Sequence, residues 1–141
     1  MKFKTKKDKW FWFGGFVDGE GCLSLVYHPK KVYPHSYRKT PYWDIRLTIV
    51  NTSRRLMDFL KKEFGGDYYI QKKINHPINK KILFQWIETG KDLEKILIMI
   101  AKYSYLKSGI AKLLLQSLKT KNNKKLKKIH KKIHILNQSG I

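Results

Sequence analysis

The feature that most constrains the fold is a run of nine residues, Phe13 to Gly21, in which four glycines alternate with bulky apolar residues and two acids. Apolar side chains before and within this run recur with the 3.6-residue spacing of a helix, which predicts a helix over 9–20 with Asp8 as its N-cap. Gly19 and Gly21 end the helix, and the Glu20 carboxylate stands between them. The residues that carry the helical spacing are Trp10, Phe13, Phe16 and Val17.

The rest of the chain alternates between strand and helix patterns. Period-two alternation is clearest over 43–50, where Trp43, Ile45, Leu47 and Ile49 share one face. Residues 29–41 hold prolines and basic residues, and they are predicted to form a long basic loop or hairpin tip. Further strands are predicted over 22–28, 68–73 and 82–88, the last two joined through His76 to Asn79, and further helices over 53–64, 91–102, 106–118 and 124–136.

This order, αββαββ followed by helices, predicts an α+β fold with a four-stranded antiparallel sheet covered by helices on one face. The 141 residues are of single-domain size, with a basic C-terminal helix and tail over 119–141. The chain carries 31 Lys and Arg against 10 Asp and Glu, a net charge of +21, so a polyanionic partner such as nucleic acid is expected. Charge alone equally fits a small ribosomal protein.

Other compositional signals exclude several classes of protein. Cys22 is the only cysteine, so no internal disulfide forms. We expect no secretory signal, no membrane association and no small-molecule substrate. His130 and His134 lie one helical turn apart but lack a third zinc ligand, and they are interpreted as surface residues. The excess of lysine, isoleucine and asparagine suggests an AT-rich genome, such as that of a chloroplast or mitochondrion.

The polar parity of the strands predicts a nucleic-acid surface, because Arg, Gln and Lys hydrogen-bond base edges and phosphates. A solvated sheet face is the alternative. With the sheet in a major groove, the Lys-rich C-terminal helix is expected to contact phosphates. The DNA-binding candidates from strand parity and the basic tip are Ser24, Val26, His28, Lys30, Lys31, Arg38, Lys39, Asp44, Arg46, Thr48, Tyr69, Gln71, Lys73 and Gln85, and a family resemblance adds Lys107.

The run Phe13 to Gly21 resembles the LAGLIDADG motif of homing endonucleases. A strand follows at once, residues 48–56 resemble the second strand and helix of that family, and residues 106–111 resemble the start of its late helix. The resemblance covers essentially the whole chain. It implies a site-specific endonuclease that hydrolyses phosphodiester bonds on both strands of a long, near-palindromic DNA target, encoded within an intron.

The resemblance also implies roles for individual residues. Glu20 stands at the metal-binding acid, with Gly19 beside it as a further metal-binding candidate, and two or three Mg²⁺ or Mn²⁺ ions are expected per dimeric site. The catalytic candidates are Glu20, Asn51, Lys107 and Arg54, with Arg55 an alternative to Arg54. Asn51 corresponds to a residue that orients water, although a helix-capping role is equally compatible. Lys107 corresponds to a basic residue near the scissile phosphate.

A single motif per chain implies a homodimer. Gly15 and Gly19 are spaced i, i+4, so two copies of the helix can approach closely there, and the two Glu20 carboxylates then come together. A frayed helix is the alternative. The expected interface residues are Phe13, Gly14, Gly15, Val17, Asp18 and Gly19. A non-catalytic RNA-binding protein, either an intron maturase or a ribosomal protein, and an inactive DNA-binding relative remain alternative functions.

Overall fold

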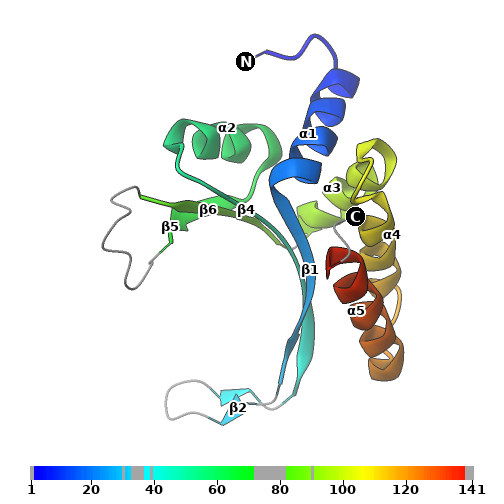
Figure 1. Cartoon of the computed structure of the whole chain (residues 1–141). Coiled ribbons are helices and arrows are strands. Elements are labelled where there is room, and N and C mark those ends of the chain that lie inside the picture. Colours follow the sequence, from blue (N-terminus) through cyan, green and yellow to red (C-terminus); the bar gives the residue numbers. More distant parts are fainter. Residues whose placement is uncertain are drawn as a thin grey trace.

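The computed structural model describes residues 2–29, 31–32, 37–38, 40–71, 82–89 and 91–138. Five helices and a curved sheet form two layers (Figure 1). The helices are α1 (Lys6–Glu20), α2 (Arg54–Phe64), α3 (Lys91–Tyr103), α4 (Ser108–Ser117) and α5 (Asn123–Gln138). The strands are β1 (Gly21–His28), β2 (Lys31–Val32), β3 (Tyr37–Arg38), β4 (Tyr42–Asn51), β5 (Asp67–Ile70) and β6 (Phe84–Glu88).

The main sheet is antiparallel throughout, with strand order β1-β4-β6-β5. The α+β fold predicted from the sequence is therefore confirmed, and the element order matches. The long β1–β4 pairing runs from Gly21 opposite Ile49 to His28 opposite Tyr42. Beyond it, β2 and β3 form a small hairpin within the predicted basic tip. Lys73 and the predicted connection at His76 to Asn79 lie outside the described residues.

Helix α1 begins earlier than the sequence predicts. Thr5, not Asp8, is its N-cap, because the Thr5 hydroxyl accepts a hydrogen bond from the Asp8 N–H at 3.1 Å. Asp8 instead lies in the first turn, where a carboxylate stabilises the positive end of the helix dipole. The C-terminal end of α1 lies at Glu20, as predicted. The backbone becomes extended at Gly21, which is the first residue of β1.

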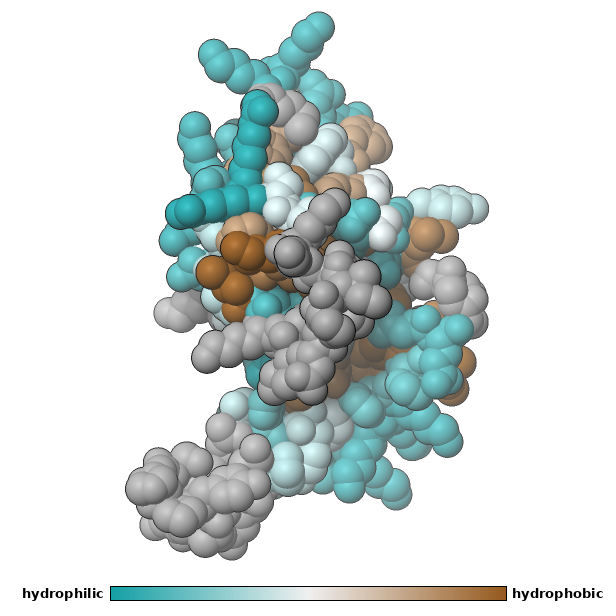
Figure 2. Space-filling view, turned by 60° about the vertical axis from the view of Figure 1, so that its left-hand side comes forward, coloured by the Kyte–Doolittle hydropathy of each residue, from teal (hydrophilic) through white to brown (hydrophobic). Residues whose placement is uncertain are grey.

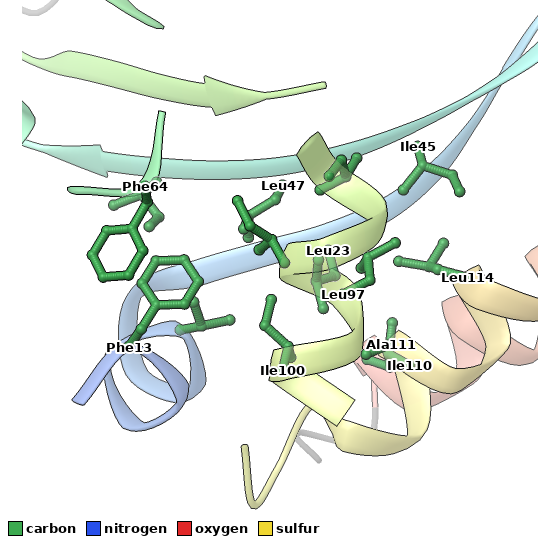
Figure 3. Packing of buried hydrophobic residues seen from close by; sticks show 14 of the residues in the cluster. Phe13, Leu23, Ile45, Leu47, Phe64, Leu97, Ile100, Ile110, Ala111 and Leu114 are labelled. Atoms are coloured by element: carbon green, nitrogen blue, oxygen red, sulfur yellow. The ribbon is translucent and has the colours of Figure 1, made fainter. Parts of the chain in front are cut away.

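The hydrophobic core lies between the sheet and the helices (Figure 3). Strand residues of one parity enter it, as the alternation over 43–50 predicts: Ile45, Leu47 and Ile49 are buried, and so is Leu23 on β1. Phe13 from α1 stacks on Phe64 from α2, with ring centroids 4.1 Å apart. The core therefore joins the first helix to the second on the same side of the sheet.

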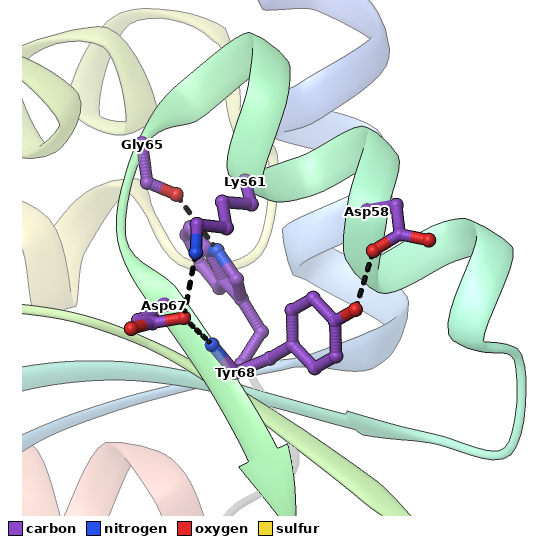
Figure 4. Close-up of polar contacts among 6 residues, drawn as sticks. Asp58, Lys61, Gly65, Asp67 and Tyr68 are labelled. Atoms are coloured by element: carbon purple, nitrogen blue, oxygen red, sulfur yellow. Dashed lines mark hydrogen bonds and ion pairs between the residues drawn. The ribbon is translucent and has the colours of Figure 1, made fainter.

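The turn between α2 and β5 is fixed by glycine and by polar contacts (Figure 4). Gly65 and Gly66 adopt φ values of 80° and 72°, which a side chain would disfavour. The Trp86 indole N–H donates to the Gly65 carbonyl at 2.9 Å, and the Tyr68 hydroxyl donates to the Asp58 carboxylate. These contacts hold α2 against β5 and β6.

All five helices lie on one side of the main sheet, and its hollow side carries no described helix (Figure 1). With that side turned forward, hydrophilic residues gather toward the top and the lower right of the view, and hydrophobic residues show in patches between them (Figure 2). Within the described residues, no helix is both long enough and apolar enough to cross a bilayer.

Candidate active site and nucleic-acid interface

Glu20 is the last residue of α1, and its side chain is exposed. Among the described residues, the Glu20 carboxylate has no hydrogen-bond partner and no ion-pair partner. The last turn of α1 also holds Asp18 and no basic residue. A carboxylate at the negative end of a helix dipole is disfavoured by about 0.3–1 kcal/mol, so the sequence places negative charge here at a cost in stability.

The sheet register brings the end of β4 beside the end of α1. Gly21 pairs with Ile49, so Glu20 lies at the level of Val50 and Asn51. The Asn51 side-chain oxygen accepts a hydrogen bond from the Ser53 N–H at 2.9 Å, and the Ser53 hydroxyl caps α2 by accepting from Leu56 N–H. Asn51 therefore stabilises the turn into α2, close to the capping alternative predicted for it. Val50 is 37% exposed and occupies the sheet's hollow side at this level.

Asp18 joins the end of α1 to the turn between α3 and α4. Its carboxylate accepts hydrogen bonds from the Ser104 hydroxyl, from Tyr105 N–H at 2.8 Å and from Lys107 N–H at 3.1 Å. Lys107 precedes α4 and is thereby held beside the C-terminal end of α1, with its side chain half-buried. The structure thus brings together the regions of Glu20, Asn51 and Lys107, which are far apart in sequence.

The same contacts set the ionisation of Asp18. Burial raises the pKa of this carboxyl, but hydrogen bonds from Ser104 and from the backbone of the 105–107 turn outweigh burial, so the pKa lies below its usual value. Asp18 is therefore ionised at neutral pH, and its hydrogen bonds connect α1 to the turn between α3 and α4.

Arg54 and Arg55 lie in the first turn of α2, and both are exposed. Arg54 lies near Tyr68 and Asp58, and a hydrogen bond with Tyr68 raises the pKa of its guanidinium. This environment places Arg54 on the β5 side of α2. The assignment of one of these arginines to the reaction stays a prediction.

The outer face of α1 is bare. A Cβ atom built on Gly15 or Gly19 meets no heavy atom within 4 Å, and both glycines are exposed. By contrast, Phe13, Gly14 and Val17 are buried in the chain's own core. This corrects the predicted interface: those three residues cannot contact a second chain, and Asp18 is engaged by the 104–107 turn. Of the six predicted interface residues, Gly15 and Gly19 remain exposed for contact with a second chain.

The hollow side of the main sheet gathers the predicted polar residues; we call it the open face. Cross-strand pairs place Ser24 opposite Arg46, Val26 opposite Asp44 and Tyr69 opposite Gln85. The open face is formed by Ser24, Val26, His28, Asp44, Arg46, Thr48, Tyr69 and Gln85, together with residues that the sequence reasoning missed, Cys22, Tyr42, Val50 and Ile87. The sequence could have indicated these residues. Cys22, Tyr42 and Val50 lie at strand ends and have the same parity as the chosen residues, and Ile87 has that parity but is apolar.

A polar cluster lies at the outer end of the open face. Arg46 Nε donates to the Asp44 carboxylate at 2.9 Å, and its Nη2 lies 3.4 Å from His28 Nε2. The His28 ring stacks on Tyr42, with centroids 4.4 Å apart. Near the other edge, the Tyr69 hydroxyl donates to the Gln85 side-chain oxygen at 3.1 Å. These contacts hold several donors and acceptors in fixed positions, which suits the reading of base edges.

Some predicted contact residues are described only in part. Gln71 continues the Tyr69 parity, and its N–H donates to the Leu83 carbonyl at 2.8 Å. Lys31 and Arg38 pair through the backbone of the tip hairpin. Lys30, Lys39 and Lys73 lie outside the described residues.

Helix α5 lies on the side opposite the open face (Figure 1). Leu126 and Ile133 are buried, the Asn137 side chain donates to the Leu23 carbonyl at 3.3 Å, and the Trp43 indole donates to Asn123 at 2.9 Å. The helix thus lies on the side of the sheet away from the open face, and its contact with phosphates stays a prediction.

A divalent cation at Glu20 fits this donor set in part. The carboxylate is an oxygen ligand of the kind that Mg²⁺ prefers, and no described residue occupies it. However, no group of three or more His, Cys, Asp or Glu residues gathers anywhere in the described part of the chain. The described residues of one chain therefore offer at most part of a metal site, and a complete site at Glu20 would need further ligands.

No protein-family model matches the sequence. Solved structures do. The homing endonuclease I-CvuI, in complex with its target in the presence of 2 mM Ca, is 25% identical, with a TM-score of 0.67 over 92% of this chain and 82% of that chain. A complex of I-CvuI with the I-CreI target in 2 mM Mg gives 24% identity and the same TM-score over 91% of this chain and 81% of that chain.

Two further complexes match over most of this chain. The archaeal intron-encoded homing endonuclease I-Vdi141I, bound to DNA, has a TM-score of 0.59 and 18% identity over 95% of this chain and 85% of that chain. The I-LtrWI LAGLIDADG homing endonuclease, bound to target DNA, has a TM-score of 0.64 and 19% identity over 98% of this chain and only 45% of that chain. The chain therefore has the DNA-binding nuclease fold of the LAGLIDADG homing endonucleases, the family that its nine-residue motif resembles.

Proposed function

We propose that this chain is one subunit of a homodimeric, metal-dependent endonuclease that cuts both strands of a long, near-palindromic DNA target. The observation that carries the proposal is the end of α1, where an exposed Glu20 carboxylate, without a hydrogen-bond or ion-pair partner among the described residues, lies beside an exposed glycine face. A second copy packed on Gly15 and Gly19 brings two Glu20 carboxylates to the two-fold axis. The target is then expected to share the two-fold symmetry of the dimer.

The residues around Glu20 fit this chemistry. The two Glu20 carboxylates, with Gly19 as a candidate backbone ligand, would hold Mg²⁺ or Mn²⁺ together with phosphate oxygens. When bound, such ions activate a water molecule and stabilise the leaving oxygen of a phosphodiester. Lys107, held beside α1 by Asp18, supplies positive charge near the scissile phosphate, where it stabilises developing negative charge. Arg54 or Arg55 is the second basic candidate.

The open face supports binding of the DNA duplex. Polar side chains such as Ser24, Arg46 and Gln85 share this face, which no described helix covers (Figure 1), and the chain's charge of +21 attracts phosphates from a distance. Arg46 and Gln85 are the side chains best suited to hydrogen-bond purine edges. We propose that they set part of the sequence preference.

Cleavage of a library of randomised duplexes tests the proposal. With Mg²⁺ we expect defined double-strand cuts in a minority of sequences, no cutting in excess chelator, and recovery with Mg²⁺ or Mn²⁺. Glu20→Gln removes the charged metal ligand, so we expect the cleavage rate to fall about a thousandfold or more, while binding to the selected duplex persists.

Glu94→Gln is the matched control, because Glu94 is an exposed carboxylate on α3 and remote from the motif. It should cut at the wild-type rate. Full activity of Glu20→Gln would refute the assignment of the acid. A protein that binds RNA or DNA but cuts no member of the library would instead be a binding protein on this fold.

We further propose that the gene lies within an intron of an organellar genome. The lysine-, isoleucine- and asparagine-rich composition supports an AT-rich origin. Sequencing the DNA that flanks the reading frame tests this: continuous, intronless flanks would contradict it.

A further inference from the structure

The C-terminal third of the chain carries a second basic surface. From Lys95 to Ile141 the sequence contains twelve lysines and no Asp or Glu. Six of these lysines lie on α5, and all six are exposed: Lys124, Lys125, Lys127, Lys128, Lys131 and Lys132. We call these six residues the α5 basic surface.

The α5 basic surface is separated from the open face by the sheet and the core. Leu126 and Ile133 are buried, and Ile133 packs in the cluster that also contains Leu23 of β1. The apolar side of α5 is thus covered by the protein, and its lysines point away from it. The α5 basic surface and the open face thus lie on opposite sides of the main sheet.

Nothing in the described structure neutralises this charge. The ion pairs among the described residues involve Lys9, His28, Arg46 and Lys61, and none involves α5. Three lysine pairs at i, i+4 spacing, such as Lys124 and Lys128, repel each other by about 0.2–0.5 kcal/mol each. The helix therefore accumulates repulsion that a bound polyanion would relieve.

The composition of α5 restricts the kind of polyanion. It has no Phe, Tyr or Trp, the large rings on which the bases of a single strand stack, and the ring of its His130 lies against Trp43. Its apolar face is packed against the core, so it cannot insert into a lipid surface. Lysine contacts phosphate as a point charge without reading base edges, and Lys124 to Lys132 extend over about 12 Å, enough to follow a duplex backbone.

We propose that the α5 basic surface binds a second segment of double-stranded DNA, without sequence preference, while the open face holds the first. DNA is the duplex expected here because this inference rests on the proposed function, in which the protein works on DNA. The consequence is that one protein molecule bridges two duplexes, which allows transfer between DNA segments during the search for a target.

A bridging assay tests the proposal. A 40-bp duplex of random sequence is fixed to beads, full-length protein is added, and capture of a fluorescent second duplex is measured over a salt series. The test variant is Lys124→Gln with Lys128→Gln, Lys131→Gln and Lys132→Gln. We expect at least a tenfold loss of captured second duplex, and a log–log salt slope smaller by about 3 to 4, since each phosphate contact contributes about 0.9.

The matched control removes four exposed lysines at the other end of the chain, by Lys2→Gln, Lys4→Gln, Lys6→Gln and Lys7→Gln. It loses the same formal charge and should bridge as the wild type does. Equal loss in both variants would overturn the proposal, because overall charge rather than the α5 basic surface would then explain capture. Wild-type protein that binds the fixed duplex and captures no second one would also overturn it.

Two further arms separate this proposal from its foundation. Glu20→Gln protein should bridge fully, so failure of cleavage leaves the bridging result intact. Replacing the fluorescent DNA by double-stranded RNA of equal length tests the partner: capture of RNA in place of DNA would overturn the choice of DNA.

Discussion

The two faces of α1 meet opposite surroundings. On the inner face, Gly14 packs directly on the backbone of Tyr103, where a built Cβ would lie 2.7 Å from the carbonyl carbon. On the outer face, the next residue, Gly15, meets nothing within 4 Å. Adjacent glycines in one motif therefore serve different purposes: one lets α1 approach α3 within the chain, and the other leaves room for a partner.

The largest effect is expected at the inner face. Gly14→Ala places a methyl group against immobile backbone, so we expect a loss of about 3 kcal/mol in the free energy of unfolding, measured by urea denaturation. Gly109→Ala in α4 is the control, because its Cβ meets open space. It should leave stability unchanged or raise it by up to about 1 kcal/mol. Equal free energies of unfolding for Gly14→Ala and Gly109→Ala would contradict the close packing inferred at Gly14.

The outer face is expected to respond through assembly instead of folding. Gly15→Leu has room in the isolated chain, so the monomer should keep its fold. If two copies of α1 pack at this glycine, the added side chain should raise the dimer dissociation constant about a hundredfold, or about 2.7 kcal/mol. Sedimentation at several protein concentrations measures this. An unchanged dimer would place the subunit contact elsewhere.

The contrast between satisfied and unsatisfied groups extends to two carboxyls. Asp18 accepts three hydrogen bonds, whereas Glu88, 3% exposed at the end of β6, has one oxygen without a hydrogen-bond partner among the described residues. Burial, with a smaller contribution from Asp92, raises the pKa of Glu88 to about 7. Burial and the charge of Asp92 therefore oppose ionisation of Glu88, whereas hydrogen bonds favour ionisation of Asp18.

Glu88→Gln should therefore stabilise the protein in alkaline solution. The folded pKa of Glu88 lies above the usual 4.5, so ionisation opposes folding: wild-type stability falls as pH rises from 4.5 to about 7. At pH 8 we expect the variant to be more stable by about 2 kcal/mol, and at pH 4 the difference should vanish. Urea denaturation at both pH values measures this, and a pH-independent difference would contradict it.

The smallest effect is expected at Asp18. Its folded pKa lies below 3.8, so the charged form stabilises the fold above that value, and the contribution is lost as pH falls through the folded pKa. Asp18→Asn should cost about 1–2 kcal/mol at pH 7, and less as the solution becomes acidic. Cleavage should fall as well, because the neutral amide accepts the Lys107 N–H bond more weakly and holds Lys107 less firmly beside α1. Glu94→Gln, which alters an exposed carboxyl on α3, is the control for cleavage.

Much of the fold could be predicted from local patterns. Alternation over 43–50 gave the buried face of β4, because side chains in a strand point to opposite sides by geometry alone. The end of α1 at Gly21 was predicted from equally local information. The N-cap was misplaced at Asp8, because Thr5 and Asp8 both have capping side chains and only the backbone shows which one accepts a bond.

The site was predicted less completely. Glu20 and Lys107 were selected by resemblance, but the bond from Lys107 N–H to Asp18 that links their regions spans 89 residues and follows no local pattern. The predicted interface mixed inner and outer residues of α1. Helical spacing shows which residues share a face, but not which face the chain covers itself.

By itself, the sequence determined the strands and helices, the basic charge and the position of an acid at the end of a glycine-rich helix, since these depend on spacing and residue type. Only the tertiary structure decided that Gly14 is buried while Gly15 is bare, and that the lysines of α5 face away from the open face. Packing between distant segments fixes which side of each element reaches solvent. That side is where a second chain or a second nucleic acid must bind.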